Sequence, residues 1–260
     1  MPNFDLIHSR NALLACLATM TALAACGGGA SRYQGMEPDA LFQLATDEFA
    51  GGDHGNAVEV LDRLLISHGD WDRIPEARLM LGDVYFDRGE FLTARSEYTR
   101  FIDRYAGHAG SADASLGICK SLASLAPTAE RDQGYTQEAI TSCRNVVIDF
   151  AGRDQSAEAA RISNELRHTL AEKEFLTGEF YYRRGLWDAA IKYYEFVANL
   201  YPESDYAAGA LLGVYLSNQQ IGYQDLADEA RDLLLQRYPD SEAAEQIKAL
   251  GPEAADGNRG

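Results

Sequence analysis

The feature that most constrains this fold is an internal repeat built on a glycine that is followed five residues later by an alanine. An apolar residue stands seven positions after each alanine, and an aromatic residue or a histidine stands eleven positions after it. The glycine–alanine pairs are Gly52/Ala57, Gly89/Ala94, Gly134/Ala139, Gly185/Ala190 and Gly222/Ala227. Self-similarity with a period of roughly 20–50 residues indicates stacked supersecondary units. We therefore expect five units, called repeats 1 to 5 below.

Within one repeat, the residue types predict two helices joined by a tight turn. The glycine is expected to end the first helix, where a left-handed residue is needed. Tyr-Pro at Tyr201 and Tyr238 is expected to end a second helix, because the residue before proline disfavours the helical region. A small residue twelve positions before the alanine lets the two helices approach closely, as at Ala45, Gly82 and Gly178. The pattern predicts an all-α fold, a right-handed solenoid of about five tetratricopeptide-like helix–turn–helix repeats.

Three departures from regular spacing predict local features of the solenoid. Residues 125–135 form a polar insertion with Pro127, which is expected to be a loop inside repeat 3. Residues 156–184 lack proline and glycine until Gly178, are rich in helix formers, and predict one helix of nearly thirty residues, about 43 Å long. In repeat 5, Tyr215 stands where a small residue is expected, so the first helix of that repeat departs most from the pattern.

The N-terminus has the pattern of an export signal that ends in a lipidation site. Residues 12–24 are apolar but fall short of the ~20 residues that a spanning helix needs, which favours a secretory signal core. The run ends in Leu23-Ala24-Ala25-Cys26, which resembles a bacterial lipobox. We expect cleavage after residue 25 and a covalent diacylglyceryl group and acyl lipid on Cys26. An ordinary signal with an incidental cysteine is the alternative.

The same segment leads to an expected location. Residues 26–37 begin with a glycine run and are interpreted as a flexible lipidated tether. Gly27, rather than aspartate, follows the cysteine, and by analogy with Gram-negative lipoproteins this favours the periplasmic face of the outer membrane. Several acyl chains would hold the protein there firmly. Residues 38–247 are expected to form the repeat domain, and residues 248–260 a disordered tail.

Charge and composition argue against several functions. The chain has a formal net charge of −17, whereas a nucleic-acid-binding protein needs a basic footprint, so no nucleic acid is expected as a partner. The histidines are scattered, and the sequence has no metal-binding or nucleotide-binding motif, so we expect no metal, no cofactor other than the lipid and no catalytic residues. A periplasmic hydrolase built on helical repeats, the enzyme alternative, would need a cluster of titratable groups.

Apolar side chains on the first helices of the repeats are candidates for a peptide-binding groove. In stacked helix pairs, first helices line the concave face, and the residues expected to point into it are Phe42, Phe49, Leu79, Phe86, Phe175 and Tyr182. Such residues can accept an extended apolar–polar peptide, such as a β-strand that ends in an aromatic residue. The alternative is that they pack between neighbouring repeats. Nearby acids, including Glu76 and Glu179, argue against capture of a free C-terminal carboxylate.

Repeats 3 and 4 contain further candidates. Arg183 and Arg184 either compensate a helix dipole or form salt bridges with a partner, and Trp187 either packs between helices or anchors an interface. Cys119 and Cys143 fall on the two helices of repeat 3, where an oxidising periplasm permits a disulfide. Cys143 occupies a packed repeat position, which favours two buried thiols over a bond.

The order of these features resembles the family of outer-membrane protein assembly factor BamD, the lipoproteins of the β-barrel assembly machinery. The resemblance is carried by the lipobox, the five repeats, the insertion in repeat 3 and the phrase LAEKEFLTGEFYYRRGLWDAAIKYYEFVANLYPES at 170–204. It covers nearly all of residues 38–245. It implies a non-enzymatic scaffold that binds the periplasmic domains of the barrel-assembly insertase through its C-terminal repeats. It also implies contact with other assembly lipoproteins and with unfolded outer-membrane proteins near the N-terminal repeats.

A different tetratricopeptide lipoprotein, such as a secretin pilotin or a cell-wall enzyme adaptor, is the alternative within the scaffold class. A pilotin is expected to lack the insertion in repeat 3 and the long helix of repeat 4.

Overall fold

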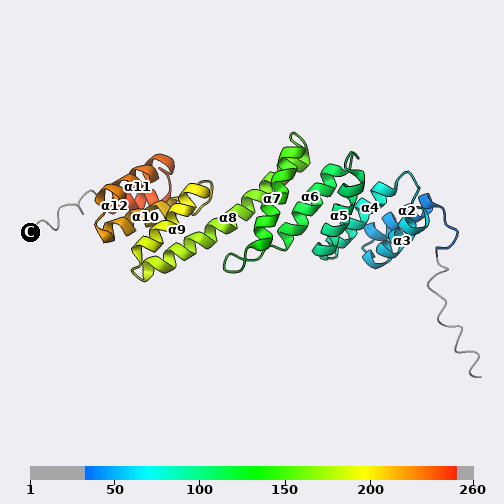
Figure 1. The fold of residues 1–260 in the computed structure, drawn as a ribbon, viewed down its shortest axis with the longest axis horizontal. Coiled ribbons are helices and arrows are strands. Elements are labelled where there is room, and N and C mark those ends of the chain that lie inside the picture. Colours follow the sequence, from blue (N-terminus) through cyan, green and yellow to red (C-terminus); the bar gives the residue numbers. More distant parts are fainter. Residues whose placement is uncertain (1–32, 251–260) are drawn as a thin grey trace, which may run out of the picture. The chain divides into compact units, whose positions relative to one another are not determined.

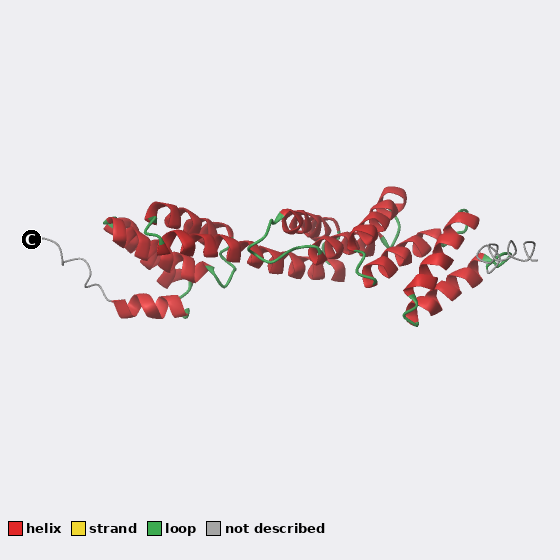
Figure 2. Ribbon diagram, turned by 90° about the horizontal axis from the view of Figure 1, so that it is seen from below, coloured by secondary structure: helices red, strands yellow, loops and turns green. Residues whose placement is uncertain are grey.

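The structure is a computed structural model that describes residues 33–250, and within this range it contains eleven helices and no strand (Figures 1 and 2). The prediction of an all-α fold of tetratricopeptide-like helix pairs is confirmed. The helices are α2 (Pro38–Ala50), α3 (His54–Ser67), α4 (Ile74–Asp87), α5 (Phe91–Tyr105), α6 (Ser111–Ser124), α7 (Gly134–Asp149), α8 (Asp154–Arg183), α9 (Trp187–Leu200), α10 (Ala207–Ile221), α11 (Gln224–Arg237) and α12 (Glu242–Leu250). The chain divides into two compact units, with the boundary inside α4 between Val84 and Tyr85. Cys26 and the predicted signal lie outside the described residues.

The N-terminal unit is built on the pair α2 and α3. Leu41 of α2 and Leu61 and Leu64 of α3 are completely buried in its core. The side chain of Asp53 caps α3 by accepting a hydrogen bond from the backbone N–H of Asn56 at 3.1 Å. Tyr33, which precedes α2, is only 7% exposed. The last part of the predicted tether of residues 26–37 thus contains a buried ring.

Glycines end the first helices of four repeats, as the pattern predicts. Gly52, Gly89, Gly185 and Gly222 have φ between 71° and 79°, a left-handed conformation that costs a glycine little. Repeat 3 differs, because Gly134 is the first residue of α7 and the preceding helix α6 ends ten residues earlier at Ser124. In repeat 3 the insertion therefore lies between the end of the first helix and this glycine, whereas in the other repeats the glycine closely follows the first helix.

In the C-terminal unit, each helix from α5 to α12 packs against the next one in the chain, apart from α12, which ends the series. Alternate helices also meet, because α6 contacts α8, α8 contacts α10, and α10 contacts α12. This pattern is that of a tetratricopeptide stack, in which each helix pair contacts only its neighbours. Figure 1 shows the same succession from green to red.

The longest element, α8, has 30 residues, which corresponds to about 45 Å. This confirms the prediction of one long helix over 156–184. Its first half buries Ala159 and Ile162 with residues of α6 and α7, whereas its second half buries Ala171 with residues of α9 and α10. One helix thus contributes to two successive hydrophobic cores.

The insertion in repeat 3 is a loop of defined structure, organised by the buried side chain of Gln133. Its amide group donates hydrogen bonds to the backbone carbonyls of Thr128 at 2.8 Å and Arg131 at 3.1 Å, and its carbonyl oxygen accepts one from the Thr136 hydroxyl at 2.6 Å. Lys173 of α8 donates to the carbonyl of Arg131 at 3.3 Å, which joins the loop to the long helix.

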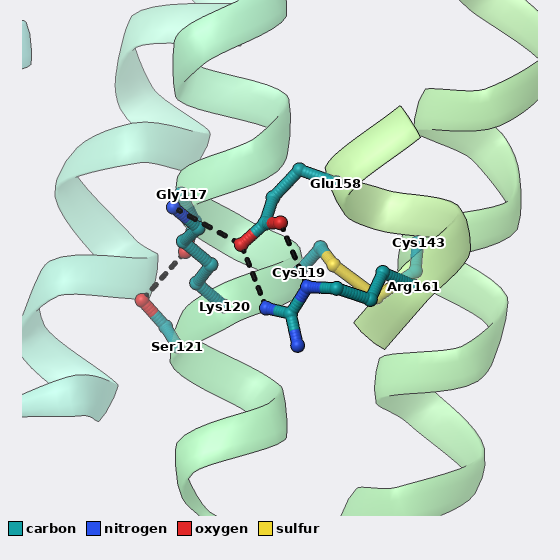
Figure 3. The surroundings of a disulfide bond; sticks show 7 residues. All are labelled: Gly117, Cys119, Lys120, Ser121, Cys143, Glu158 and Arg161. Carbon is teal, nitrogen blue, oxygen red and sulfur yellow. Dashed lines mark hydrogen bonds and ion pairs between the residues drawn. A yellow bond between two sulfur atoms is a disulfide. The ribbon is translucent and has the colours of Figure 1, made fainter. Parts of the chain in front are cut away.

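Cys119 and Cys143 form a disulfide between α6 and α7 (Figure 3). The expectation of two buried thiols is therefore wrong, although both residues are completely buried, as expected. The two helices are adjacent, and their packing brings the two Cα atoms to 4.9 Å, within the usual range for a disulfide. On the neighbouring helix α8, Glu158 pairs with Lys120 of α6 at 3.8 Å and with Arg161 at 2.9 Å.

At the C-terminal end, the structure contains the predicted fifth helix pair and a further helix after it. The first helix of repeat 5, α10, forms a complete helix in spite of its irregular pattern. The last helix, α12, continues to Leu250, so residues 248–250 are helical and not part of a disordered tail. Within the described residues, no helix combines the length and the apolar character needed to cross a membrane.

Candidate functional site

A pocket of about 450 Å³ opens in the C-terminal unit between α8, α10 and α12. We call it the acidic aromatic pocket. Two of the residues predicted to line a peptide groove, Phe175 and Tyr182, lie in its wall on α8. Its other lining residues are Glu179, Tyr194, Asp205, Ala208, Gly209, Leu212, Gly213, Leu216, Ser241, Glu242, Ala243 and Gln246. The pocket therefore needs α12, the helix that follows repeat 5.

The pocket is built around the ring of Tyr194, which lies between two helical glycines. A Cβ atom at Gly178 of α8 would lie 2.8 Å from this ring, and one at Gly213 of α10 would lie 2.5 Å from it. Phe175 packs on the ring of Tyr194 with a centroid distance of 5.6 Å and on the ring of Tyr206 at 5.3 Å. The small residues thus allow three helices to close around one tyrosine.

The charged groups that line the pocket are all acidic. Glu179, Asp205 and Glu242 line it, and no lysine or arginine does so. Basic side chains stand beside two of them, because Arg183 lies 3.5 Å from Glu179 and the imidazole of His168 lies 3.8 Å from Asp205.

Burial and an acidic side chain of the pocket change the pKa of its central tyrosine, Tyr194. Burial raises the pKa of the Tyr194 hydroxyl well above its ordinary value, and the negative charge of Glu179 adds to the rise. The hydroxyl is therefore neutral at any physiological pH and is available as a hydrogen-bonding group.

The other predicted groove residues are not gathered in this pocket. Phe42 packs on Trp71 with a centroid distance of 5.5 Å, and Phe49 packs on His54 at 5.6 Å. Phe86 packs on Phe91 at 5.3 Å, and Leu79 is half-buried on α4. Phe42, Phe49 and Phe86 each pack on a nearby ring, which for Phe49 and Phe86 belongs to the same repeat, and their role in a groove stays a prediction.

The residues predicted to contact a partner take up two different environments. Trp187 packs edge-on against Tyr182 with a centroid distance of 4.9 Å, so its ring contributes to the wall behind the pocket. The side chain of Arg183 is 66% exposed. The guanidinium of Arg184 lies 4.0 Å from the ring centroid of Phe180, on the side of α8 that faces away from the pocket.

An exposed aromatic surface that the sequence analysis missed continues from Arg184. Phe180 is 40% exposed and contacts Tyr181, and Tyr181 stacks on Tyr193 of α9 with a centroid distance of 5.3 Å. Phe196, three residues after Tyr193, is 43% exposed. We call Phe180, Tyr181, Tyr193, Phe196 and Arg184 the aromatic edge. The aromatic edge could have been predicted with helical wheels of α8 and α9, because these residues lie off the packed faces that are marked by Gly178 and Ala190.

The described residues contain no group of three or more histidine, cysteine, aspartate or glutamate side chains placed to hold a metal ion. The acidic aromatic pocket, lined by aromatic, apolar and acidic side chains, has a geometry that supports binding.

Comparison with known proteins identifies the relatives of the chain. Residues 34–234 match the profile of the family YfiO, described as outer membrane lipoprotein. The outer membrane protein assembly factor BamD of Xylella fastidiosa strain 9a5c is 25% identical over 201 residues, which are 77% of this chain and 60% of that protein. The factor of the same name from Caulobacter vibrioides is 22% identical over 232 residues, which are 87% of this chain and 75% of that protein. The chain thus spans about 60% of the length of the Xylella relative.

Solved structures of tetratricopeptide proteins are similar to this chain at low sequence identity. The TPR2AB domain of yeast Sti1, in a complex with pHSP90, is 15% identical with a TM-score of 0.47, and the match covers 82% of each chain. A TPR repeats protein from Bacteroides fragilis is 13% identical with a TM-score of 0.47, over 82% of this chain and 99% of that one. The fold assignment stands on the helix pairs of the chain itself.

Proposed function

Since the chain belongs to the YfiO family of outer membrane lipoproteins, we propose that it is a non-enzymatic scaffold of the machinery that assembles outer-membrane β-barrels. Curated relatives from several bacteria carry the name outer membrane protein assembly factor BamD. A stack of helix pairs with exposed recognition surfaces suits a scaffold, because it offers extended surfaces to several partners. The proposed partners are the periplasmic domains of the barrel insertase, other assembly lipoproteins and unfolded outer-membrane proteins.

We place the protein on the periplasmic face of the outer membrane, held by lipid on Cys26. The lipobox at residues 23–26 supports this proposal. The acyl chains would insert into the inner leaflet of the outer membrane, and the repeats would extend from it into the periplasm.

The aromatic edge is the observation that carries the proposed contact with the insertase. Aromatic and arginine side chains dominate the binding energy of protein interfaces. Here Arg184 lies over Phe180, whose ring begins a chain of ring contacts that reaches Tyr193 of α9. Phe196 is exposed on the same helix, three residues after Tyr193. Exposed rings on a repeat protein mark an interaction surface more often than they serve the isolated fold. The neighbouring Arg183 provides an exposed cation for an acidic partner group.

The test is gentle detergent extraction of the tagged protein followed by mass spectrometry of what co-purifies. We expect a large barrel protein with repeated periplasmic domains in stoichiometric amount. The double variant Phe180→Asp/Phe196→Asp should lose that protein. The matched control Ile148→Asp changes an exposed apolar residue on α7, 66% exposed, and should retain it.

Two results would overturn this proposal. Recovery of a secretin or a peptidoglycan enzyme in place of the barrel protein would assign the chain to another tetratricopeptide machinery. Retention of the barrel protein by the double variant would remove the aromatic edge from the contact.

Unfolded outer-membrane proteins are proposed to bind near the first repeats, where Phe42, Phe49 and Leu79 are half-buried on α2 and α4. Each keeps part of its surface free beside its packing partner, and this exposed part is available for a peptide side chain. A photo-reactive amino acid at Phe49 should cross-link an unfolded barrel substrate, whereas one at the fully surface-lying Ile66, 82% exposed on α3, should not. Equal cross-linking from both positions would contradict this location.

A further inference from the structure

We propose that the acidic aromatic pocket binds the side chain of a lysine or arginine, together with an adjoining apolar residue, from an extended segment of a partner polypeptide. The inference goes beyond the proposed function, because it assigns a ligand chemistry to one pocket and does not depend on which machinery the chain serves.

The shape of the pocket suits a long side chain with a charged end. Its volume of about 450 Å³ exceeds that of a single amino-acid side chain, so it has room for two neighbouring ones. Leu212 and Leu216 of α10 provide an apolar wall, along which the aliphatic stem of a lysine or arginine can pack. Phe175 and Tyr182 of α8 add aromatic rings to the lining, and aromatic rings can attract a cation as well as apolar groups.

The charge of the pocket selects the sign of the ligand. Three acidic residues from three different segments line it: Glu179 from α8, the exposed Asp205 from the turn before α10, and the exposed Glu242 from the first turn of α12. Arg183 and His168 stand beside two of them, while Glu242 is paired only with a neutral group, accepting a hydrogen bond from the amide of Gln246 at 3.2 Å. An entering carboxylate would be repelled, whereas an ammonium or guanidinium group would gain opposite charges close by.

Two other occupants are disfavoured by their charge. The C-terminal residues 251–260 of this chain contain Glu253, Asp256 and a single cation, Arg259, so this segment carries the same sign of charge as the pocket. A second copy of the chain has a formal net charge of −17 and does not complement the pocket either. A basic segment of a different polypeptide is the complementary ligand.

The experiment measures the binding of three fluorescein-labelled, C-terminally amidated peptides to the mature lipidated protein in detergent micelles by fluorescence anisotropy. The peptides share a Gly-Val-Phe-X-Val-Gly sequence in which X is lysine, norleucine or glutamate. We expect the lysine peptide to bind at least about tenfold more tightly than the norleucine peptide, and the glutamate peptide to bind more weakly still. Affinity for the lysine peptide should fall as sodium chloride screens the charges.

Matched variants locate the binding. Glu179→Gln/Glu242→Gln removes two charges from the pocket and should weaken the lysine peptide at least about tenfold. Glu195→Gln/Glu229→Gln removes two charges from exposed positions on α9 and α11 outside the pocket and should change affinity less than about twofold. Leu212→Trp, which fills the pocket without changing its charge, should abolish binding, and circular dichroism confirms that each variant keeps its helix content.

Each contrary outcome overturns the proposal. Equal affinity for lysine and norleucine would make the pocket a purely apolar site, and preference for glutamate would reverse the sign of the ligand. Equal losses in both double variants would show attraction to the overall charge, and absence of binding by every peptide would mean that the pocket takes no such segment. The proposed pull-down of the barrel protein depends on Phe180 and Phe196, which lie outside this pocket. The peptide-binding result can therefore fail while the pull-down result stands, and the reverse is also possible.

Discussion

At the scale of single residues, Tyr194 and the two glycines around it determine how closely α8, α9 and α10 pack. A glycine inside a helix costs about 1 kcal/mol relative to alanine. Gly178 and Gly213 both lie inside helices, and a Cβ at either would overlap the ring of Tyr194. The space that they leave for the ring outweighs their poor helix propensity.

We predict that Gly213→Ala lowers the free energy of unfolding by about 1–3 kcal/mol, because the added methyl group would meet the ring at 2.5 Å. In a Tyr194→Leu background the overlap is relieved, and the same substitution should become neutral or stabilising by up to about 1 kcal/mol. Urea unfolding of the four proteins, followed by circular dichroism, measures this coupling. Gly55→Ala on α3, whose Cβ would have an ordinary contact at 3.6 Å, should not destabilise. An equal cost of Gly213→Ala in both backgrounds would rule out the ring as the cause.

A second residue, Gln133, holds the insertion of repeat 3 in shape. Gln133→Leu would leave the Thr136 hydroxyl without its 2.6 Å partner and would leave the carbonyls of Thr128 and Arg131 without the amide. An unsatisfied buried polar group costs about 1–3 kcal/mol, and the loop between α6 and α7 should therefore become sensitive to protease. Limited proteolysis with mass mapping tests this result. Gln137→Leu, an exposed position on α7, is the control, and new cleavage in both variants would disconnect the effect from Gln133.

At the scale of elements, the outcome of each sequence prediction depended on how local its signal was. The long helix α8 was predictable because residues 156–177 contain neither proline nor glycine, and helix formation depends on such local composition. The start of α7 could not be predicted in this way. Gly134 has the repeat position of a glycine that ends a first helix, but the insertion before it changes the turn, and α7 begins at this glycine. The repeat pattern therefore located the pairs but not every boundary.

Features that depend on how the helices pack could not be predicted from the sequence. The disulfide requires Cys119 and Cys143 to face each other across α6 and α7, and the repeat pattern indicates only that one of them is buried. The pocket depends on α12, whose residues lie partly in the segment expected to be a tail. Phe175 and Tyr182 of α8 line this pocket together with residues of α12, the last described helix.

The disulfide should stabilise the pair α6 and α7 by restricting the unfolded chain. It closes a loop with a sequence separation of 24, for which loop-closure entropy predicts about 3 kcal/mol. We expect a reducing agent to lower the urea midpoint of the protein, and Cys119→Ala/Cys143→Ala to have the lowered midpoint with or without reductant. If reductant shifts the protein and the double variant equally, the effect arises elsewhere than in this bond.

At the scale of the whole molecule, the two proposed recognition surfaces of the C-terminal unit occupy different sides of α8. The pocket residues Phe175, Glu179 and Tyr182 lie on one side of this helix, and Phe180 and Arg184 lie on another. A scaffold with separate surfaces can hold two partners at once, so variants of one surface should leave binding to the other intact. The matched pull-down and peptide titrations described above compare the two directly.

The proposed lipid anchor on Cys26 would determine where these surfaces lie in the cell, and this residue is outside the described part of the chain. We predict that Cys26→Ser leaves the repeat domain folded, because the buried core of the described part of the chain is built from residues between Tyr33 and Ile247. Without the thiol no diacylglyceryl group can be attached, and the signal would not be processed by the lipoprotein route. If another peptidase removes the signal, the protein should appear in the soluble periplasmic fraction; if none does, the uncleaved signal retains it at the inner membrane. Membrane fractionation after a salt wash, combined with mass measurement of the N-terminus, separates these two cases. A variant that is cleaved after residue 25 and still sediments with the outer membrane would show that protein contacts, and not the lipid, hold the scaffold in place.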